Sequence, residues 1–355
     1  MKRISIIVPC LNEQEALLIY YRKTSEIMEG MKEAEFEFIF IDDGSSDRTL
    51  DLLRQFKERD RRCRYLSFSR NFGKEAAIYA GFQYARGDYI TVMDADLQDP
   101  PELIPQMYEE LEGGQYDCVA ARRIDRKGEK PLRSFLSSMF YKVADRISKI
   151  QVMEGARDFR MMTRRMADAV LEMSEYNRFS KGIFGWVGFQ TKWLEYRNAE
   201  RVAGETKWPL PKLLKYSLDG ILGFSTLPLA LSSYGGIFFC GAAFLTVCFL
   251  VIRYLIFHDP VQGWTTLMCA IFFIGGVQLL CVGILGQYLA RTYMEVKRRP
   301  VYILKENSDE EYAQKERERD ERKTDTAAVS SDFCGDCGNI LSFTEHAGNH
   351  CRFKD

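Results

Sequence analysis

The chain has 355 residues, with 49 lysines and arginines against 50 aspartates and glutamates, and a formal net charge of −1. This balance argues against a nucleic-acid partner and against a polyanionic substrate, so any electrostatic function must be local. The ten cysteines are spread along a chain that opens directly on a strand-like run rather than a secretory leader, which predicts reduced cytosolic thiols.

Apolar strands and amphipathic helices alternate along the first part of the chain. Strands are expected at residues 4–8, 36–41, 65–68, 89–93 and 116–121, and helices at residues 12–31, 46–60, 74–85 and 100–113. Strands that are apolar throughout indicate a mainly parallel sheet covered on both faces. The expected fold class is therefore α/β, with ligands bound at the carboxyl ends of the strands.

Polar clusters follow three of these strands, at residues 9–13 (PCLNE), 42–47 (DDGSSD) and 94–98 (DADLQ). Asp94 and Asp96 are two apart in an extended chain, so both point to one side and repel unless a cation or a proton intervenes. Short oxygen ligands of this kind suit Mg²⁺ or Mn²⁺. The alternative is capping of the next helix, which suits Asp99 before Pro100 but explains Asp94 and Asp96 poorly.

The cluster at residues 42–47 has two interpretations of similar weight. It is either an ordinary strand-to-helix turn with a serine cap, or a site where Asp42 binds a nucleotide base or ribose. No Gly-rich phosphate loop and no GxGxxG motif follows any of the strands. Phosphates would therefore be held by metal and side chains, which argues against an ATPase, a kinase or a dinucleotide-dependent dehydrogenase.

Two long apolar stretches, residues 231–257 and 265–289, contain a single charge, Arg253. Each is long enough to cross a bilayer, and buried core helices are the less favoured alternative. The linker at residues 258–263 has no lysine or arginine, whereas basic residues precede and follow the pair. The positive-inside rule then places both termini in the cytoplasm, with the linker outside.

These features predict four parts of the chain. We expect a cytosolic domain at residues 1–206, amphipathic interfacial helices at 207–229, two transmembrane helices at 230–292 and a charged cytosolic tail at 293–355. The tail ends with a set of residues typical of a zinc site, although incidental residues in a polar tail are the favoured interpretation. This set consists of Cys334, Cys337, His346, His350 and Cys351.

The order of the motifs resembles glycosyltransferase family 2, and within it the polyprenyl-phosphate sugar transferases. The resemblance rests on residues 9–13, 42–47, 70–74 (RNFGK), 94–100, 155–160 (GARDFR) and 201–208 (RVAGETKW), followed by the two apolar stretches. It covers about residues 3–304 and departs from the pattern at Thr206, where the family often has serine. It implies a GT-A type nucleotide-diphospho-sugar fold and inversion at the anomeric carbon.

The resemblance also assigns site residues. Those expected to bind the nucleotide sugar are Pro9, Leu11, Glu13, Asp42, Asp94, Ala95, Asp96, Gln98, Arg201 and Lys207. Asp94, Asp96 and Gln98 would hold the Mg²⁺ or Mn²⁺ ion, and Arg201 and Lys207 would close on the diphosphate. Residues 122–133 are rich in arginine and lysine, and are either a solvated face or a clamp for a lipid phosphate. The expected acceptor ligands are Arg122, Arg133 and Ser137.

Asp158 is assigned by the resemblance as the catalytic base. A phosphate monoester has a second pKa of about 6, however, so such an acceptor needs little deprotonation at neutral pH. Asp158 is therefore either an orienting group or the acceptor of a residual proton. If it acts as a base, the rate loss of Asp158→Asn shrinks as the pH rises above about 7.

The expected function is transfer of a hexose, with glucose from UDP-glucose favoured and GDP-mannose as the alternative, to polyprenyl phosphate in the bacterial cytoplasmic membrane. The expected partners are the nucleotide-diphospho-sugar, the lipid phosphate and the bilayer, with homo-oligomers left open. A processive polysaccharide synthase is a weaker reading, because residues 177–186 (NRFSKGIFGW) lack a Gln-x-x-Arg-Trp motif. A non-catalytic membrane scaffold is a second rival.

Overall fold

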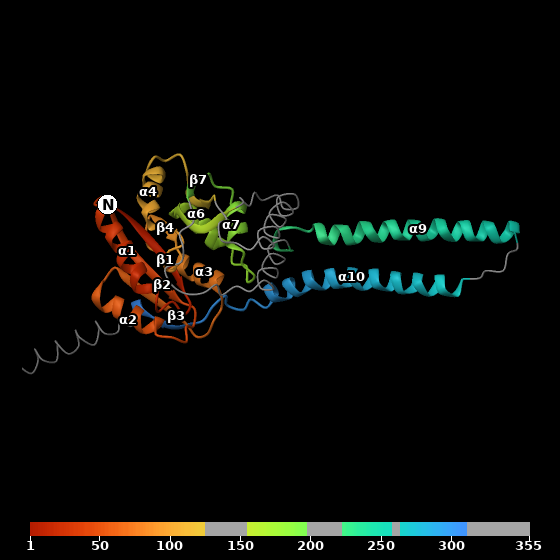
Figure 1. Ribbon diagram of the computed structural model, residues 1–355, viewed down its shortest axis with the longest axis horizontal. Coiled ribbons are helices and arrows are strands. Elements are labelled where there is room, and N and C mark those ends of the chain that lie inside the picture. The colour runs from red at the N-terminus through yellow and green to blue at the C-terminus, as the bar shows by residue number, and fades with distance from the viewer. Residues whose placement is uncertain (125–154, 197–221, 258–262, 311–355) are drawn as a thin grey trace, which may run out of the picture. The chain divides into compact units, whose positions relative to one another are not determined.

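A computed structural model describes residues 1–124, 155–196, 222–257 and 263–310. Its centre is an eight-stranded sheet in the order β7-β5-β6-β4-β1-β2-β3-β8 (Figure 1). The strands are β1 (Lys2–Cys10), β2 (Ala34–Asp42), β3 (Cys63–Phe68), β4 (Tyr89–Val92), β5 (Cys118–Arg123), β6 (Ala156–Thr163), β7 (Thr191–Tyr196) and β8 (Leu304–Asn307).

Helices follow or connect these strands. They are α1 (Leu17–Gly30), α2 (Thr49–Arg59), α3 (Lys74–Tyr84), the 3₁₀ turn η1 (Pro101–Leu103), α4 (Ile104–Glu112), α6 (Arg164–Glu172), α7 (Ser180–Trp186), α9 (Leu227–Phe257) and α10 (Trp264–Val296). The α/β class and the strand–helix order expected for the first 120 residues are confirmed, with boundaries shifted by a few residues.

The sheet separates two hydrophobic cores, as expected for strands that are apolar on both sides. Alternate residues of β1 enter opposite cores: Ile6 belongs to one and Ile7 to the other, and both are fully buried. Helices α1, α2 and α4 supply the first core, and α3, α6 and α7 supply the second (Figure 1). Burial on both faces is the main stabilisation of the sheet, because it removes the apolar side chains of every central strand from water.

Strands β1, β2, β3 and β4 are parallel, so their carboxyl ends lie at the same end of the sheet. Strand β6 runs antiparallel to β4, and Val92 pairs with Arg160. Continuing this register by two residues brings Asp158 opposite Asp94. The start of β6 therefore meets the end of β4 at the same place as the polar clusters.

Helix α1 begins at Leu17, five residues later than Asn12, the start expected from the periodicity. The intervening residues form a turn, in which Asn12 has a φ of 52°. The Asn12 amide donates to the Ser45 hydroxyl at 2.9 Å, and the Asn12 side-chain oxygen accepts from the Ser46 amide at 2.8 Å. These contacts with the next loop hold the turn and delay the helix.

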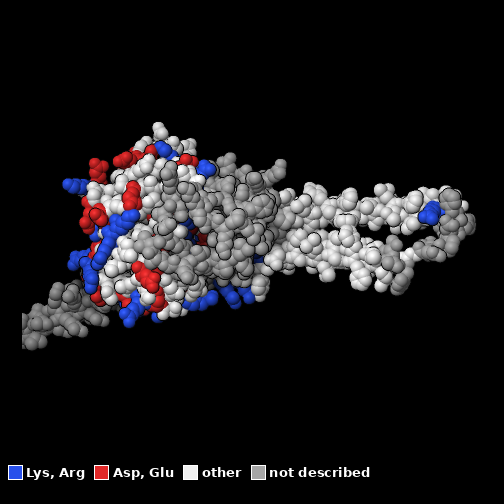
Figure 2. Space-filling model, in the orientation of Figure 1, with Lys and Arg blue, Asp and Glu red and all other residues white. Residues whose placement is uncertain are grey.

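Helices α9 and α10 are long and apolar enough to cross a membrane, over Leu227–Arg253 and Leu267–Val296, and each contains an 18-residue window with a mean hydropathy of 2.4. Their side chains are exposed, and their surface is almost free of charge (Figure 2). The two helices contact each other through Phe239 and Phe273, whose ring centroids are 5.6 Å apart. The pair is consistent with the expected hairpin.

The segment after α10 returns to the sheet. The Tyr302 ring stacks on Phe68 of β3 with centroids 4.9 Å apart, and the Ser69 amide donates to the Ile303 carbonyl at 3.0 Å. The Tyr302 hydroxyl also donates to the Gln83 side chain in α3. The expected division into a domain ending at residue 206 and a separate tail therefore leaves out residues that pack on the sheet.

Gly44 provides a test of the turn after β2. It has a φ of +69°, and a Cβ atom built there would lie 2.6 Å from the backbone carbonyl carbon of Arg70. We expect Gly44→Ala to lower the free energy of unfolding by about 1–3 kcal/mol, because it adds both strain and a clash with backbone. Gly30→Ala is the matched control, since no atom lies within 4 Å of its Cβ position. Thermal unfolding in detergent should separate the two variants, and equal midpoints would contradict this account of the turn.

Candidate active site

The loops after β1 and β2 form one wall of the site and are joined by hydrogen bonds. Besides the contacts of Asn12, the Glu13 amide donates to the Thr49 hydroxyl at 2.9 Å. Pro9, Leu11 and Glu13 are partly exposed beside this wall. The structure therefore brings the first two polar clusters together, as the parallel topology requires.

Asp42 and Asp43 hold the framework of this wall. Asp42 is 1% exposed, and its carboxylate accepts from the Ser45 amide at 3.0 Å and from the Ser67 hydroxyl at 2.8 Å. The Asp43 carboxylate accepts from the amides of Phe72 and Gly73. These contacts form a turn, but the serine cap of the turn interpretation is absent: Arg48 precedes α2 without a side-chain cap, and the Thr49 amide donates to Asp47 at 3.0 Å. The role of Asp43 in shaping residues 70–73 was not anticipated.

Asp94 and Asp158 face each other across β4 and β6, and the side chain of Lys74 lies between them. The Lys74 Nζ atom is 2.7 Å from Asp94 Oδ1 and 2.6 Å from Asp158 Oδ2. Two carboxylates at opposing positions of an antiparallel pair repel each other. The ammonium of Lys74 removes that repulsion, and its position follows from the start of α3 directly after the loop that Asp43 holds.

The ion pairs change the proton affinities of these groups. Burial by itself favours the neutral acid, but the ammonium of Lys74, aided by Lys181 and Arg160, outweighs it and holds the pKa of Asp158 below its usual range. Burial likewise disfavours the Lys74 ammonium, but the carboxylates of Asp158 and Asp94 outweigh it and raise the pKa of Lys74. Asp158 is therefore a carboxylate at neutral pH.

Residues 93–98 alternate in exposure, although Ala95 and Asp96 lie in a turn and not in an extended segment. Asp94, Asp96 and Gln98 are partly exposed, whereas Met93, Ala95 and Leu97 are buried. Leu97 has a φ of 56°, which bends the chain after Asp96. The backbone N–H of Gln98 donates to Asp96 Oδ1 at 3.1 Å. The side chains of Asp94, Asp96 and Gln98 are thus all partly accessible to solvent.

The prediction that Asp99 caps the next helix is wrong. The residue before η1 is Pro100, and no side chain caps it. Asp99 is 2% exposed; its carboxylate accepts from the Tyr196 hydroxyl and lies 3.6 Å from Arg157 Nε. Burial raises the pKa of Asp99 to about 6, against the opposing charge of Arg157. The apolar surroundings of this acid could not be inferred from the local sequence.

Arg157 connects this buried acid to the exposed side of the site. Its Nη2 atom donates to Gln98 Oε1 at 3.2 Å, so one guanidinium contacts both Asp99 and Gln98. The contact orients the Gln98 side chain, because a planar guanidinium offers its donors in fixed directions. Sequence reasoning passed over Arg157, although it lies next to Asp158 in a quoted motif.

A divalent cation needs several donor side chains grouped together. Among the described residues, no three His, Cys, Asp or Glu side chains are grouped as a metal cluster. Asp94, Asp96 and Gln98 offer two carboxylates and one amide, a partial oxygen set of the kind that Mg²⁺ or Mn²⁺ would complete with water and phosphate. In this structure the Asp94 carboxylate is paired with the Lys74 ammonium.

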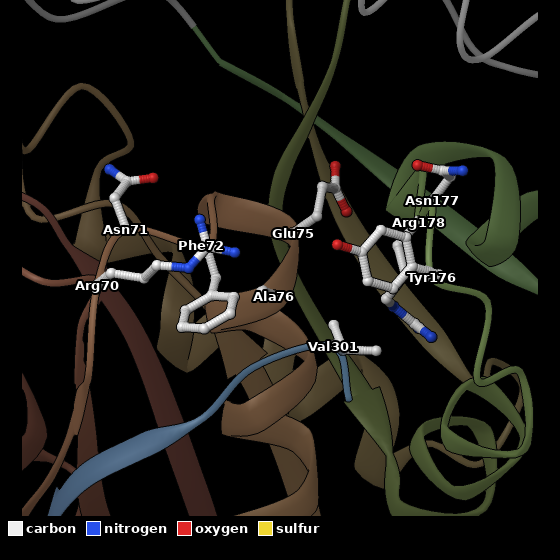
Figure 3. Close-up of a pocket in the computed structure, with 9 residues that line it drawn as sticks. All are labelled: Arg70, Asn71, Phe72, Glu75, Ala76, Tyr176, Asn177, Arg178 and Val301. Carbon is white, nitrogen blue, oxygen red and sulfur yellow. The ribbon is translucent and has the colours of Figure 1, made fainter. Parts of the chain in front are cut away.

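A pocket lies beside the start of α3 (Figure 3). It is lined by Arg70, Asn71, Phe72, Glu75, Ala76, Tyr176, Asn177, Arg178 and Val301. Glu75 accepts a hydrogen bond from the Ser180 amide at 3.0 Å at the start of α7. Lys74 therefore forms ion pairs with Asp94 and Asp158, whereas the next residue of α3, Glu75, accepts a hydrogen bond from the start of α7.

The remaining predicted residues are partly outside the described chain. Arg122 lies in β5, partly exposed, and its Nη1 atom is 3.7 Å from Glu195 Oε1. Arg133 and Ser137 fall in residues 125–154, and Arg201 and Lys207 fall in residues 197–221, both outside the described residues. The same holds for the five cysteines and histidines of the tail, in residues 311–355.

Comparison with known proteins identifies the family. Residues 5–171 match the model of glycosyl transferase family 2. The chain is 42% identical over 305 residues to the SfII prophage-derived bactoprenol glucosyl transferase of Shigella flexneri, covering 86% of this chain and 98% of that protein. It is also 42% identical over 303 residues to the prophage bactoprenol glucosyl transferase homolog of Escherichia coli K12, covering 85% and 98%.

Among solved structures, glucosyl-3-phosphoglycerate synthase of Mycobacterium tuberculosis, in complex with Mn²⁺ and UDP-glucose, matches with 20% identity and a TM-score of 0.40. The match covers 62% of this chain and 77% of that one. A likeness at this level says nothing about the chemistry of the present chain. The identity to curated relatives over most of both lengths is decisive: the chain belongs to glycosyl transferase family 2.

Proposed function

We propose that this protein transfers glucose from UDP-glucose to a membrane polyprenyl phosphate, with inversion at the anomeric carbon. The observation that carries the proposal is the 42% identity over 98% of a protein named bactoprenol glucosyl transferase. The acid cluster at the carboxyl end of the sheet and the two apolar helices support it, because they supply a polar donor site and a route to a lipid substrate.

The donor is assigned to the wall formed by the loops after β1 and β2. Pro9, Leu11 and Glu13 lie partly exposed there and would line the nucleotide. Asp42 is buried and already bonded to Ser45 and Ser67, so its contribution is to hold the loop that faces the nucleotide. Arg201 and Lys207 would close on the diphosphate.

A divalent cation, Mg²⁺ or Mn²⁺, is assigned to Asp94, Asp96 and Gln98, with Ala95 between them. When bound, the cation stabilises the negative charge that develops on the leaving diphosphate. The chain's part is to present the partly exposed carboxylates of Asp94 and Asp96 and to orient Gln98 through Arg157. Asp99 holds Arg157 through their ion pair, and Arg157 in turn contacts the Gln98 side chain.

The acceptor phosphate is assigned to Arg122, Arg133 and Ser137. The hairpin of α9 and α10 would hold the protein in the bacterial cytoplasmic membrane with both termini in the cytoplasm, as the distribution of basic residues favours. Interfacial helices at residues 207–229 would bring the lipid headgroup level with the donor site. Holding both substrates side by side supplies orientation.

Asp158 is assigned as an orienting group. The acceptor oxygen attacks C1 of the sugar from the face opposite the diphosphate, and the acceptor is already largely ionised at neutral pH. A carboxylate whose pKa is held low by Lys74 is a weak proton acceptor, which supports orientation over base catalysis.

The direct test is a transfer assay. Membranes or purified protein are incubated with polyprenyl phosphate and a panel of labelled UDP- and GDP-sugars, and lipid-extractable label is counted. We expect label from UDP-glucose, its loss with EDTA, and its loss in Asp94→Asn. If only GDP-mannose gives label, the donor is GDP-mannose and the proposed type of reaction stands. No label from any sugar would overturn the proposed reaction and favour a non-catalytic scaffold.

The role of Asp158 is tested by the pH profile of Asp158→Asn. We expect a loss of about 100-fold in kcat, because the acceptor is no longer held in line. Since Asp158 is ionised across the neutral range, the ratio of wild-type to variant rates should stay constant from about pH 6.5 to about pH 9. A ratio that falls as the pH rises would instead indicate a base.

Asp117→Asn serves as the control for this profile. Asp117 also has an ion pair, with Arg165 at 3.1 Å, but it lies outside the proposed site. Its rate should match the wild type at every pH. A similar loss in both variants would mean that the effect of Asp158→Asn is structural.

A further inference from the structure

Lys74 lies where the proposed donor site requires a cation. Its Nζ atom contacts both oxygens of Asp94, at 2.7 and 2.8 Å, and also Asp158 at 2.6 Å. Asp94 is at the same time a proposed metal ligand. The ammonium and a divalent cation therefore compete for the same carboxylate.

We propose that Lys74 is a built-in counter-cation that keeps the divalent metal out of the donor-free site and couples metal binding to donor binding. This inference rests on the assignment of Asp94 to the metal in the proposed function. A metal ion that binds Asp94 must displace the ammonium from it. The displaced ammonium then needs another anion, and the diphosphate of the donor brings one.

The consequence is a positive coupling between the two ligands. Without nucleotide, the metal gains a carboxylate only at the cost of breaking the Lys74–Asp94 pair. With nucleotide, the ammonium exchanges one anionic partner for another while the metal binds both the acid and the phosphates. Each ligand therefore raises the affinity of the other, and by linkage the factor is the same in both directions.

The local structure allows this exchange. The backbone at the start of α3 is held, because the Gly73 amide donates to both carboxylate oxygens of Asp43, at 3.1 and 3.0 Å. The Lys74 side chain is 31% exposed, and a lysine has a flexible four-carbon stem with rotatable donors. The charge can therefore move while the helix stays in place.

The test measures Mn²⁺ binding to the full-length protein in detergent without nucleotide, by the paramagnetic resonance signal of free Mn²⁺. Lys74→Met leaves two acids without their ammonium, so we expect its Kd for Mn²⁺ to fall by about tenfold or more relative to wild type. Lys192→Met is the matched control. Its Nζ atom pairs with Glu110 at 2.6 Å, with 34% and 29% exposure, close to the values for Lys74 and Asp94.

The coupling itself is measured by adding UDP. Wild type should bind Mn²⁺ more tightly by at least about fivefold with saturating UDP, a factor at the low end of coupling between sites. This gain should shrink in Lys74→Met and persist in Lys74→Arg, which keeps the charge. A Lys74→Met protein that binds Mn²⁺ no more tightly than wild type, or no more tightly than Lys192→Met, would overturn the inference.

Two further outcomes keep the inference separate from folding and from catalysis. If Lys74→Met does not fold, the test rests on Mn²⁺ binding to the wild-type protein. Equal Mn²⁺ affinity with and without UDP then overturns the proposal. The binding measurement uses neither sugar nor lipid. A tighter Mn²⁺ site in Lys74→Met therefore supports the counter-cation even if the transfer assay finds no label, in which case the proposed function fails alone.

Discussion

The repulsion between Asp94 and Asp158 is the constraint on which the site depends. The register of β4 and β6 brings the two carboxylates together at the end of the sheet, and Lys74 makes this arrangement stable. Lys74 can reach them because α3 begins directly after a loop held by Asp43. The Asp43 carboxylate thus fixes the backbone of the loop before α3, and the start of α3 in turn places the Lys74 ammonium.

Much of this site could be predicted from the sequence, because parallel strands bring their carboxyl ends together whatever their order. The clusters after β1, β2 and β4 meet for that reason. Asp94 and Asp96 were expected to share one side of an extended segment; both are partly exposed, but Ala95 and Asp96 form a turn. The positions of the helices followed from periodicity, except where loops contact each other, as Asn12 and Ser45 do.

Other parts depended on contacts between residues far apart in the chain. The antiparallel pairing of β6 decides that Asp158 faces Asp94, and nothing in the local sequence around Asp158 specifies a strand direction. Asp99 has the sequence context of a helix cap, but it is buried against Tyr196, which is distant in the sequence. The role of Lys74 could not be predicted from the motif at residues 70–74, because it depends on Asp94 and Asp158, which are distant in the sequence.

The return of the chain to β3 after α10 has a consequence for biosynthesis. The residues up to β7 emerge from the ribosome first, but the flank of β3 receives Tyr302 and Ile303 only after both long helices have been made. Until then the ring of Phe68 lacks its stacking partner, and a sheet edge of this kind is a site of aberrant pairing. The last step of domain folding therefore has to wait until both long helices have been synthesised, because the residues that complete this edge follow them in the chain.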